Sequence, residues 1–265
     1  MEFYKFDGAG NDFILVDVRR SAWVPDAAQV AAMCHRRLGI GADGLMTLGL
    51  PPADVAGCQF SMTYFNSDGS RAAMCGNGGR CIALFAHLSG LTSGGASAPL
   101  RFMADDGLHE ADILMWDKTA RVGLVRIAMR DVARSTVRRC LDGWLLDTGV
   151  PHYVQRVSGL AGYDVEREGR RLRHAPELGA EGANIDFIED RDDGRLMIRT
   201  YERGVEGETL SCGTGVTAAA IVSGNGRVST RGGDFAVAFS AGDDSYSGIT
   251  LTGPVSLNFT GDWNL

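Results

Sequence analysis

Ser70-Arg71-Ala72-Ala73-Met74-Cys75-Gly76-Asn77-Gly78-Gly79-Arg80 is the stretch that decides the fold, and it recurs as Gly207-Glu208-Thr209-Leu210-Ser211-Cys212-Gly213-Thr214-Gly215-Val216. In both copies a polar turn leads into Cys-Gly-[Asn/Thr]-Gly and then into an apolar run. An alternating segment that is typical of a strand, 59–65 or 195–201, precedes each copy. Because the copies lie about half a chain apart, we infer a duplication. It predicts two similar halves, residues 1–118 and 119–251.

The periodicity of the apolar residues predicts an α+β protein. Strands are expected at 13–18, 45–48, 59–65, 122–129, 183–188, 195–201, 235–239 and 255–259. Asp26 is an expected N-cap, because Val30, Ala31, Cys34 and Leu38 follow at helical spacing. Two further helices, 80–88 and 216–223, are apolar on nearly every side and should be buried. Each half is therefore expected to be a curved, mostly antiparallel, barrel-like sheet around a central helix, and Ser93–Ser97 to be a flexible loop.

Cys75 and Cys212 are the candidate catalytic residues, because each lies where a strand gives way to a helix. A helix N-terminus carries unpaired N–H groups and partial positive charge, which lower the pKa of a nearby thiol. The same N–H groups can hold a carboxylate, and here they belong to Gly76, Asn77, Gly213 and Thr214. If the halves face each other across a cleft, the thiols flank one carbon from opposite sides. That arrangement predicts inversion of a stereocentre by two bases, without a cofactor.

Each of these signals also has a plainer interpretation. A single Cys-Gly-x-Gly before a helix is usually a buried small residue, and two copies in the same context favour catalysis. The other cysteines, Cys34, Cys58, Cys81 and Cys140, lack this context and are interpreted as core residues. The histidines and cysteines lack the spacing of metal ligands, so no metal site is expected.

Composition excludes several classes of protein. The 265 residues carry a formal net charge of -7, which argues against nucleic-acid and basic membrane-surface partners. No apolar run is long enough for a membrane span. The start, Met1–Gly8, lacks the pattern of a signal peptide, which predicts a cytoplasmic protein. Only two lysines, Lys5 and Lys118, could form the Schiff base of a pyridoxal enzyme, which disfavours that chemistry.

A series of motifs runs along nearly the whole chain: Gly8–Phe13, Gly39–Gly44, Phe65–Ser70 with Met74–Gly78, Gly149–His152, Gly182–Asn184, Tyr201–Gly204 and Ser211–Gly215. In this order they resemble diaminopimelate epimerase, a pyridoxal-independent family of amino acid epimerases. The resemblance implies epimerisation of L,L-diaminopimelate to meso-diaminopimelate in lysine and peptidoglycan precursor biosynthesis. It also implies that a last strand, 252–265, returns to the first half. The only partner it implies is a small amino acid substrate, and a homodimer is left open.

The resemblance assigns roles to individual residues. Cys75 and Cys212 would be the acid–base pair, and His152 and Glu202 would assist their ionisation. The substrate-binding residues would be Asn11, Asn66, Gly76, Asn77, Asn184, Glu202, Arg203, Gly213 and Thr214. Taken alone, Glu202 and Arg203 look like solvated neighbours, the asparagines like turn residues and His152 like a loop histidine.

This chain departs from the family pattern at three positions. Val150 stands where an asparagine is usual, Asp7 where a histidine is usual, and Gly44 where a glutamine is frequent. These changes concern substrate recognition more than the thiols. They leave open a racemase of another amino acid, such as histidine, on the same scaffold. A cysteine-nucleophile hydrolase or transferase and a non-catalytic binder are alternatives from other classes.

Overall fold

The computed structural model describes residues 1–21, 23–91 and 98–264, and the expected loop 93–97 lies outside these ranges. The chain forms two compact units, Met1–Ile127 with Pro254–Leu265, and Ala128–Gly253. Both combine helices with a mostly antiparallel sheet, as the α+β prediction states.

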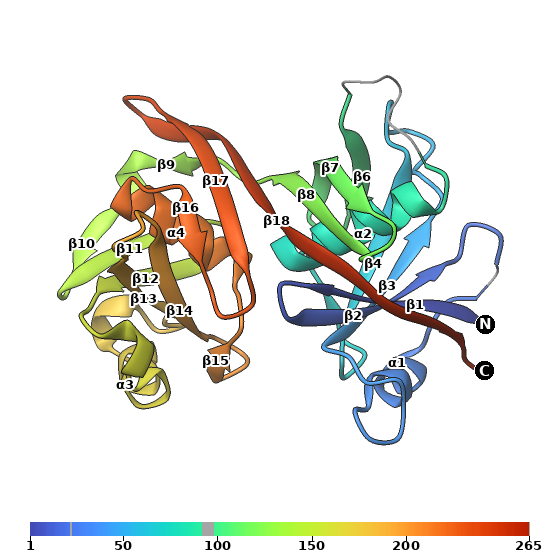
Figure 1. Cartoon of the computed structure of the whole chain (residues 1–265), viewed down its shortest axis with the longest axis horizontal. Coiled ribbons are helices and arrows are strands. Elements are labelled where there is room, and N and C mark those ends of the chain that lie inside the picture. The colour runs from blue at the N-terminus through green and yellow to red at the C-terminus, as the bar shows by residue number, and fades with distance from the viewer. Residues whose placement is uncertain (22, 92–97, 265) are drawn as a thin grey trace. The chain divides into compact units, whose positions relative to one another are not determined.

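The first unit begins with a hairpin, and its helices interrupt the run of strands that follows (Figure 1). Its elements are β1 (Glu2–Gly8), β2 (Asn11–Asp17), α1 (Ala27–Cys34), β3 (Gly44–Gly49), β4 (Phe60–Asn66), β5 (Arg71–Ala72), α2 (Gly76–Leu88), β6 (Leu100–Ala104), β7 (Gly107–Asp117) and β8 (Val122–Ala128). Helix α2 packs against β1, β2, β3 and β7. Every residue from Gly76 to Ala86 is buried, so the prediction of a central helix is confirmed.

The second unit repeats this order. Its elements are β9 (Val132–Ala133), η1 (Arg134–Thr136), β10 (Arg138–Cys140), β11 (Gly143–Asp147), β12 (Pro151–Arg156), η2 (Leu160–Gly162), α3 (Val165–Arg173), η3 (Pro176–Leu178), β13 (Asn184–Asp190), β14 (Leu196–Glu202), β15 (Gly207–Thr209), α4 (Gly213–Ser223), β16 (Arg227–Ser229), β17 (Asp234–Ala241) and the first part of β18 (Ser245–Asp262). From Pro254 onward, β18 belongs to the first unit. Helix α4 packs against β11, β12, β13, β14, β16 and β17, which makes it the central helix of this unit.

The pairing pattern supports the inferred duplication. β2 and β3 pair in parallel around α1, as β12 and β13 do around α3. β4 then pairs in parallel with β6 across α2, and β14 pairs with β16 across α4. The repeat therefore extends from the cysteine motif to the order and direction of the strands that surround it.

The first helix differs from the prediction at its end. Asp26 caps α1 as expected, and its side chain accepts a hydrogen bond from the backbone of Gln29. The helix ends at Cys34, however, and Leu38 is 83% exposed. The backbone amides of Ile40 and Gly41 both donate to the carbonyl of Met33, which closes the helix with a turn. Leu38 therefore belongs to this turn and not to the buried helix face.

Candidate active site

Cys75 is the N-cap of α2, directly before the first helical residue. Its Sγ accepts a hydrogen bond from the backbone N–H of Gly78 at 3.2 Å, in the manner of a capping side chain. A Cβ at position 78 would lie only 3.3 Å from this sulfur and 3.2 Å from the sulfur of Met46. Glycine at this position therefore keeps the helix end close to the thiol.

The side chain of Asn77 is buried within its own unit. Its Oδ1 accepts a hydrogen bond from Nη2 of Arg80 at 3.0 Å, and Arg80 also donates to the carbonyl of Gly76 at 3.1 Å. Burial lowers the pKa of the Arg80 guanidinium to about 10. The guanidinium thus stabilises the first turn of α2. Because the Asn77 side chain takes part in this contact, the predicted role of Asn77 in substrate binding belongs to its backbone N–H.

Two other predicted binding residues lie at strand ends in the first unit. Asn11 begins β2, and its Nδ2 donates to Oδ2 of Asp43 at 2.6 Å. Because a carboxylate only accepts, this contact fixes the amide with its oxygen turned away from Asp43. Asn66 ends β4 and donates from its Nδ2 to the hydroxyl of Ser70 at 3.1 Å.

Asp43 belongs to a charged network that sequence reasoning did not include. Arg36 bonds both Asp12 and Asp43, and the nearly buried Lys5 bonds Asp12. Burial alone would raise the pKa of Asp12, but the hydrogen bonds from Arg36 and Lys5 lower it to about 2. These pairs hold the β1–β2 hairpin to the segment before β3, and therefore hold Asn11 in place.

Cys212 is the N-cap of α4 and is 9% exposed. Its Sγ lies 3.3 Å from Oγ1 of Thr214. Burial raises the pKa of the Cys212 thiol well above its usual value, and the charges of Glu202 and Asp186 raise it further. The hydroxyl of Thr214 and the backbone N–H of Gly215 act in the opposite direction. The expectation that a helix N-terminus lowers the thiol pKa is therefore wrong for Cys212, because desolvation outweighs the helix end.

Glu202 ends β14, is only partly exposed, and its carboxyl is within hydrogen-bonding reach of the Cys212 thiol. It is therefore not the solvated surface residue that it looks like next to Arg203 in the sequence. Its Oε1 accepts a hydrogen bond from Oγ1 of Thr209 at 2.5 Å. Burial raises the pKa of the Glu202 carboxyl, against the hydrogen bond from Thr209, which lowers it.

Asn184 connects Arg203 to His152. The backbone N–H of Arg203 donates to Oδ1 of Asn184 at 2.7 Å, and Nδ2 of Asn184 lies 3.3 Å from Nε2 of His152. The same Nε2 lies 2.9 Å from Oγ1 of Thr214, next to Cys212. His152 lies in strand β12 and is fully buried, so its interpretation as a loop histidine is wrong. The second unit thus gathers His152, Asn184, Glu202, Arg203, Cys212 and Thr214 around one helix end.

Sequence reasoning missed Asp186, whose Oδ2 lies 2.6 Å from Nδ1 of His152. A signal for it was present in the sequence. Asn184 and Asp186 alternate with Ile185 and Phe187, so both polar side chains lie on one face of β13 and both apolar side chains on the other. Polar side chains on the buried face of a strand are candidates for a functional site.

The structure explains why position 44 is a glycine in this chain. A Cβ on Gly44 would lie 2.5 Å from the carbonyl oxygen of Phe65 and 2.6 Å from Cε2 of Tyr64. The ring of Tyr64 therefore takes the space that a side chain at position 44 would need. Nothing in the structure explains the valine at position 150.

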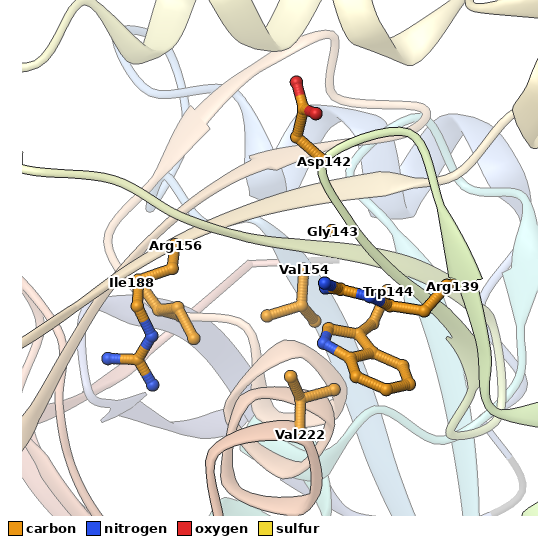
Figure 2. Close-up of a pocket in the computed structure, with 8 residues that line it drawn as sticks. All are labelled: Arg139, Asp142, Gly143, Trp144, Val154, Arg156, Ile188 and Val222. Atoms are coloured by element: carbon orange, nitrogen blue, oxygen red, sulfur yellow. The ribbon is translucent and has the colours of Figure 1, made fainter.

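A separate pocket of about 260 Å³ in the second unit contains none of the predicted site residues (Figure 2). Val222, from the C-terminal end of α4, lines it, whereas Cys212 precedes the N-terminus of that helix. Its arginines have other partners, since Arg156 pairs with Asp190 and Arg139 stacks on Trp144.

Within residues 1–21, 23–91 and 98–264, no cluster of His, Cys, Asp and Glu could hold a metal ion. No helix in that part of the chain has the length and apolar character needed to cross a membrane.

The comparisons with known proteins agree with the motifs. A family model described as diaminopimelate epimerase matches residues 3–114 and 144–257. The diaminopimelate epimerase of Flavobacterium psychrophilum is 38% identical, and the match covers 98% of each chain. That of Chlorobaculum tepidum is 43% identical over 82% of this chain and 80% of its own.

Solved structures show the same fold at low identity. A probable proline racemase from Agrobacterium radiobacter K84 is 16% identical, with a TM-score of 0.67 over 100% of this chain and 93% of that one. A PhzF-family phenazine biosynthesis protein from Bacillus anthracis is 14% identical, with a TM-score of 0.69 over 100% and 99%. Because the family model spans most of the chain and these relatives exceed 30% identity, the chain belongs to the diaminopimelate epimerase family and is an isomerase.

Proposed function

We propose that this protein interconverts L,L- and meso-diaminopimelate, with Cys75 and Cys212 as the two acid–base groups. The observation that carries the proposal is the repeated helix N-terminus. Each unit has a cysteine at the N-cap position of its central helix, in a chain of the diaminopimelate epimerase family.

The proposed chemistry needs one group that acts as a base and a second group that acts as an acid on the opposite face of the same carbon. One thiolate removes the α-hydrogen as a proton, and the other thiol donates a proton to the opposite face of the carbon. An acid or base in position contributes about 10²- to 10⁴-fold, which is far less than the whole acceleration. The backbone N–H groups at both helix ends are proposed to bind the α-carboxylate and to stabilise it as it becomes an enediolate.

The remaining predicted residues are proposed to bind the distal end of the substrate. That end carries an ammonium and a carboxylate. Glu202 suits the ammonium, and Arg203 suits the carboxylate, because charge-assisted hydrogen bonds are the stronger kind. The amide oxygen of Asn11, which does not face Asp43, is proposed as an acceptor for the ammonium.

The direct test is the uptake of deuterium at Cα from heavy water, measured by mass spectrometry with each stereoisomer of diaminopimelate. We expect wild-type protein to exchange and to interconvert the L,L and meso forms. Cys75→Ala and Cys212→Ala should each lower turnover by at least about 10²-fold, because one proton transfer loses its group. Cys58→Ala is the control, since that thiol donates to the carbonyl of Phe60 and caps no helix. Interconversion at the wild-type rate in either capping-cysteine variant would exclude the two-base mechanism.

A panel of other amino acids tests the choice of substrate. Exchange with histidine or another amino acid, but not with diaminopimelate, would favour a racemase of different specificity, which Gly44 and Val150 leave open. Trapping of a covalent acyl-enzyme would instead favour a cysteine-nucleophile hydrolase or transferase.

We place the enzyme in the cytoplasm, in keeping with six cysteines that are all free thiols.

A further inference from the structure

The side-chain amide of Asn11 is held in one orientation by Asp43. Nδ2 of Asn11 donates to Oδ2 of Asp43 at 2.6 Å, and the backbone N–H of Asp12 donates to the same oxygen at 3.2 Å. Nη2 of Arg36 donates to the other oxygen, Oδ1, at 2.6 Å. Both oxygens of Asp43 therefore act as acceptors, and the amide oxygen of Asn11 must face away from this carboxylate.

Asn11 lies close to the helix end that carries Cys75. It pairs with Gly8 across the β1–β2 hairpin. A Cβ at position 8 would lie 2.9 Å from the carbonyl oxygen of Asn77, in the first turn of α2. Residues directly opposite each other in an antiparallel pair share one face of the sheet, so the side chain of Asn11 is on the face toward this turn. Asn11 is only partly buried, so a ligand at that helix end can reach its side chain.

The second unit shows that the fold does not require this polar pair. The parallel pairs β2–β3 and β12–β13 have equivalent registers, which place Val150 where Asn11 lies and Ala183 where Asp43 lies. Both residues are apolar, and Ala183 is fully buried. Of the two equivalent positions, only position 11 therefore provides a side-chain amide. Recognition of a ligand explains why the first unit keeps an asparagine and an aspartate where the second unit has apolar side chains.

We infer that Asp43 is a positioning residue that makes Asn11 an acceptor, and thereby selects a substrate with an ammonium group at its distal end. The inference rests on the proposed function, which supplies that ammonium. An ammonium can only donate, so it can bond the amide oxygen of Asn11 but not the NH2 group. The opposite orientation of the amide would instead suit a carboxylate. Asp43 therefore decides which of the two charged groups at the distal end of diaminopimelate binds to Asn11.

Two variants separate the orientation of the amide from the size of the side chains. In Asp43→Asn the new side chain has one acceptor oxygen, so it cannot accept from both Arg36 and Asn11. When that oxygen stays with the charged guanidinium, the NH2 group at position 43 faces Asn11, whose amide then turns its own oxygen inward. The double variant Asn11→Asp with Asp43→Asn exchanges the two groups. It puts a carboxylate at position 11, which accepts from the amide at position 43 and also from an ammonium.

The experiment compares L,L-diaminopimelate with L-2-aminopimelate, which lacks only the distal ammonium. Isothermal titration calorimetry gives both dissociation constants in a Cys75→Ala background, in which the ligand should not be converted. We expect Asp43→Asn to weaken diaminopimelate binding by about tenfold, the size of one charge-assisted hydrogen bond, and to change 2-aminopimelate binding by less than about threefold. The exchanged double variant should recover the affinity for diaminopimelate. Asp17→Asn is the matched control, because Asp17 ends the strand that Asn11 begins and pairs with Arg19, and it should change neither constant.

An equal loss of affinity for both ligands in Asp43→Asn would indicate a merely structural role and would overturn the inference. So would an unchanged preference for diaminopimelate, or a double variant that does not recover it. Circular dichroism and thermal unfolding identify any variant that does not fold. Asn11→Ala provides a second route, since it should weaken diaminopimelate binding by the same factor, and adding Asp43→Asn to it should weaken binding no further. If the parent protein does not bind diaminopimelate, the proposed function fails, whereas binding with an unaltered preference in these variants refutes the inference alone.

Discussion

At the scale of single residues, the carboxyl of Glu202 connects stability to pH. Its pKa in the folded protein is raised by burial, so the folded state holds the proton to higher pH than the unfolded chain does. The stability that this group contributes is fully present below its unfolded pKa of about 4.3, and is lost as pH rises through the folded pKa. Above that window the protein carries a buried charge that opposes folding.

Glu202→Gln should therefore stabilise the protein at pH 8 and have little effect at pH 4, while lowering turnover. Each kcal/mol changes the melting temperature of a chain of this size by about 2–4 °C, so the difference is measurable by calorimetry. Glu181→Gln, which changes an exposed carboxyl, should have no such pH-dependent effect. Equal melting temperatures for Glu202→Gln and wild type across this pH range would contradict the prediction. They would show that neighbouring groups stabilise the charged carboxylate as well as water does.

At the scale of elements, the glycines at the helix starts set how closely each helix approaches its site. A Cβ at position 215 would lie 2.6 Å from Oδ1 of Asp186 and 3.3 Å from Cε1 of His152. Gly215→Ala should destabilise the protein by about 1–3 kcal/mol, because the buried pair must move. Gly162→Ala is the control, since a Cβ at position 162 would meet no atom within 4 Å, and should change stability by less than about 1 kcal/mol. Urea unfolding measures both, and an unchanged Gly215→Ala midpoint would contradict the close packing.

The elements also show what sequence can predict. Strands β2, β3, β4, β8, β13, β14, β17 and the later part of β18 were predicted from local pattern, whereas β1, β6, β7, β11 and β12 were not. The two buried helices were also predicted, but they begin earlier, at Gly76 and Gly213. Glycine disfavours helix, and here the capping position decides the start. Helix α3 was not predicted because its Val-Glu-Arg-Glu-Gly-Arg-Arg-Leu-Arg sequence has too few apolar residues for a period. Acidic residues in its first turn and arginines in its last turn stabilise it instead.

The residues of the candidate site could likewise be predicted only in part from the sequence. The repeated motif predicted both thiols at helix ends, because the strand, turn and glycines are contiguous with them in the chain. Asp186 could not be assigned to His152 from sequence, since 34 positions separate them and only the parallel pairing of β12 with β13 brings them together. The raised pKa of Cys212 could not be predicted from the sequence either, because it depends on burial, which the motif does not encode.

At the scale of the whole molecule, the first unit is assembled from two distant parts of the chain. β1 pairs with β18 from Glu2 opposite Asp262 to Asp7 opposite Ser256, and the backbones of Met1 and Trp263 bond each other in both directions at 2.8 Å. The whole second unit, Ala128–Gly253, lies in sequence between the two paired segments, Glu2–Asp7 and Ser256–Asp262. Forming this sheet therefore requires closing a loop of nearly the full chain length, which is entropically costly and slow.

A circular permutant should separate this cost from the stability of the fold. Joining the present ends with a short glycine-rich linker and opening the chain between Arg130 and Asp131, after β8, makes both units continuous in sequence. Each doubling of loop length costs about 0.6 kcal/mol, so a loop shortened more than tenfold closes with a saving of about 2 kcal/mol. We expect the permutant to refold severalfold faster in stopped-flow tryptophan fluorescence and to keep wild-type epimerase activity. The unpermuted chain with the same linker at its end is the control. A permutant that folds at the unpermuted rate would show that pairing of β1 with β18 is not part of the rate-limiting step.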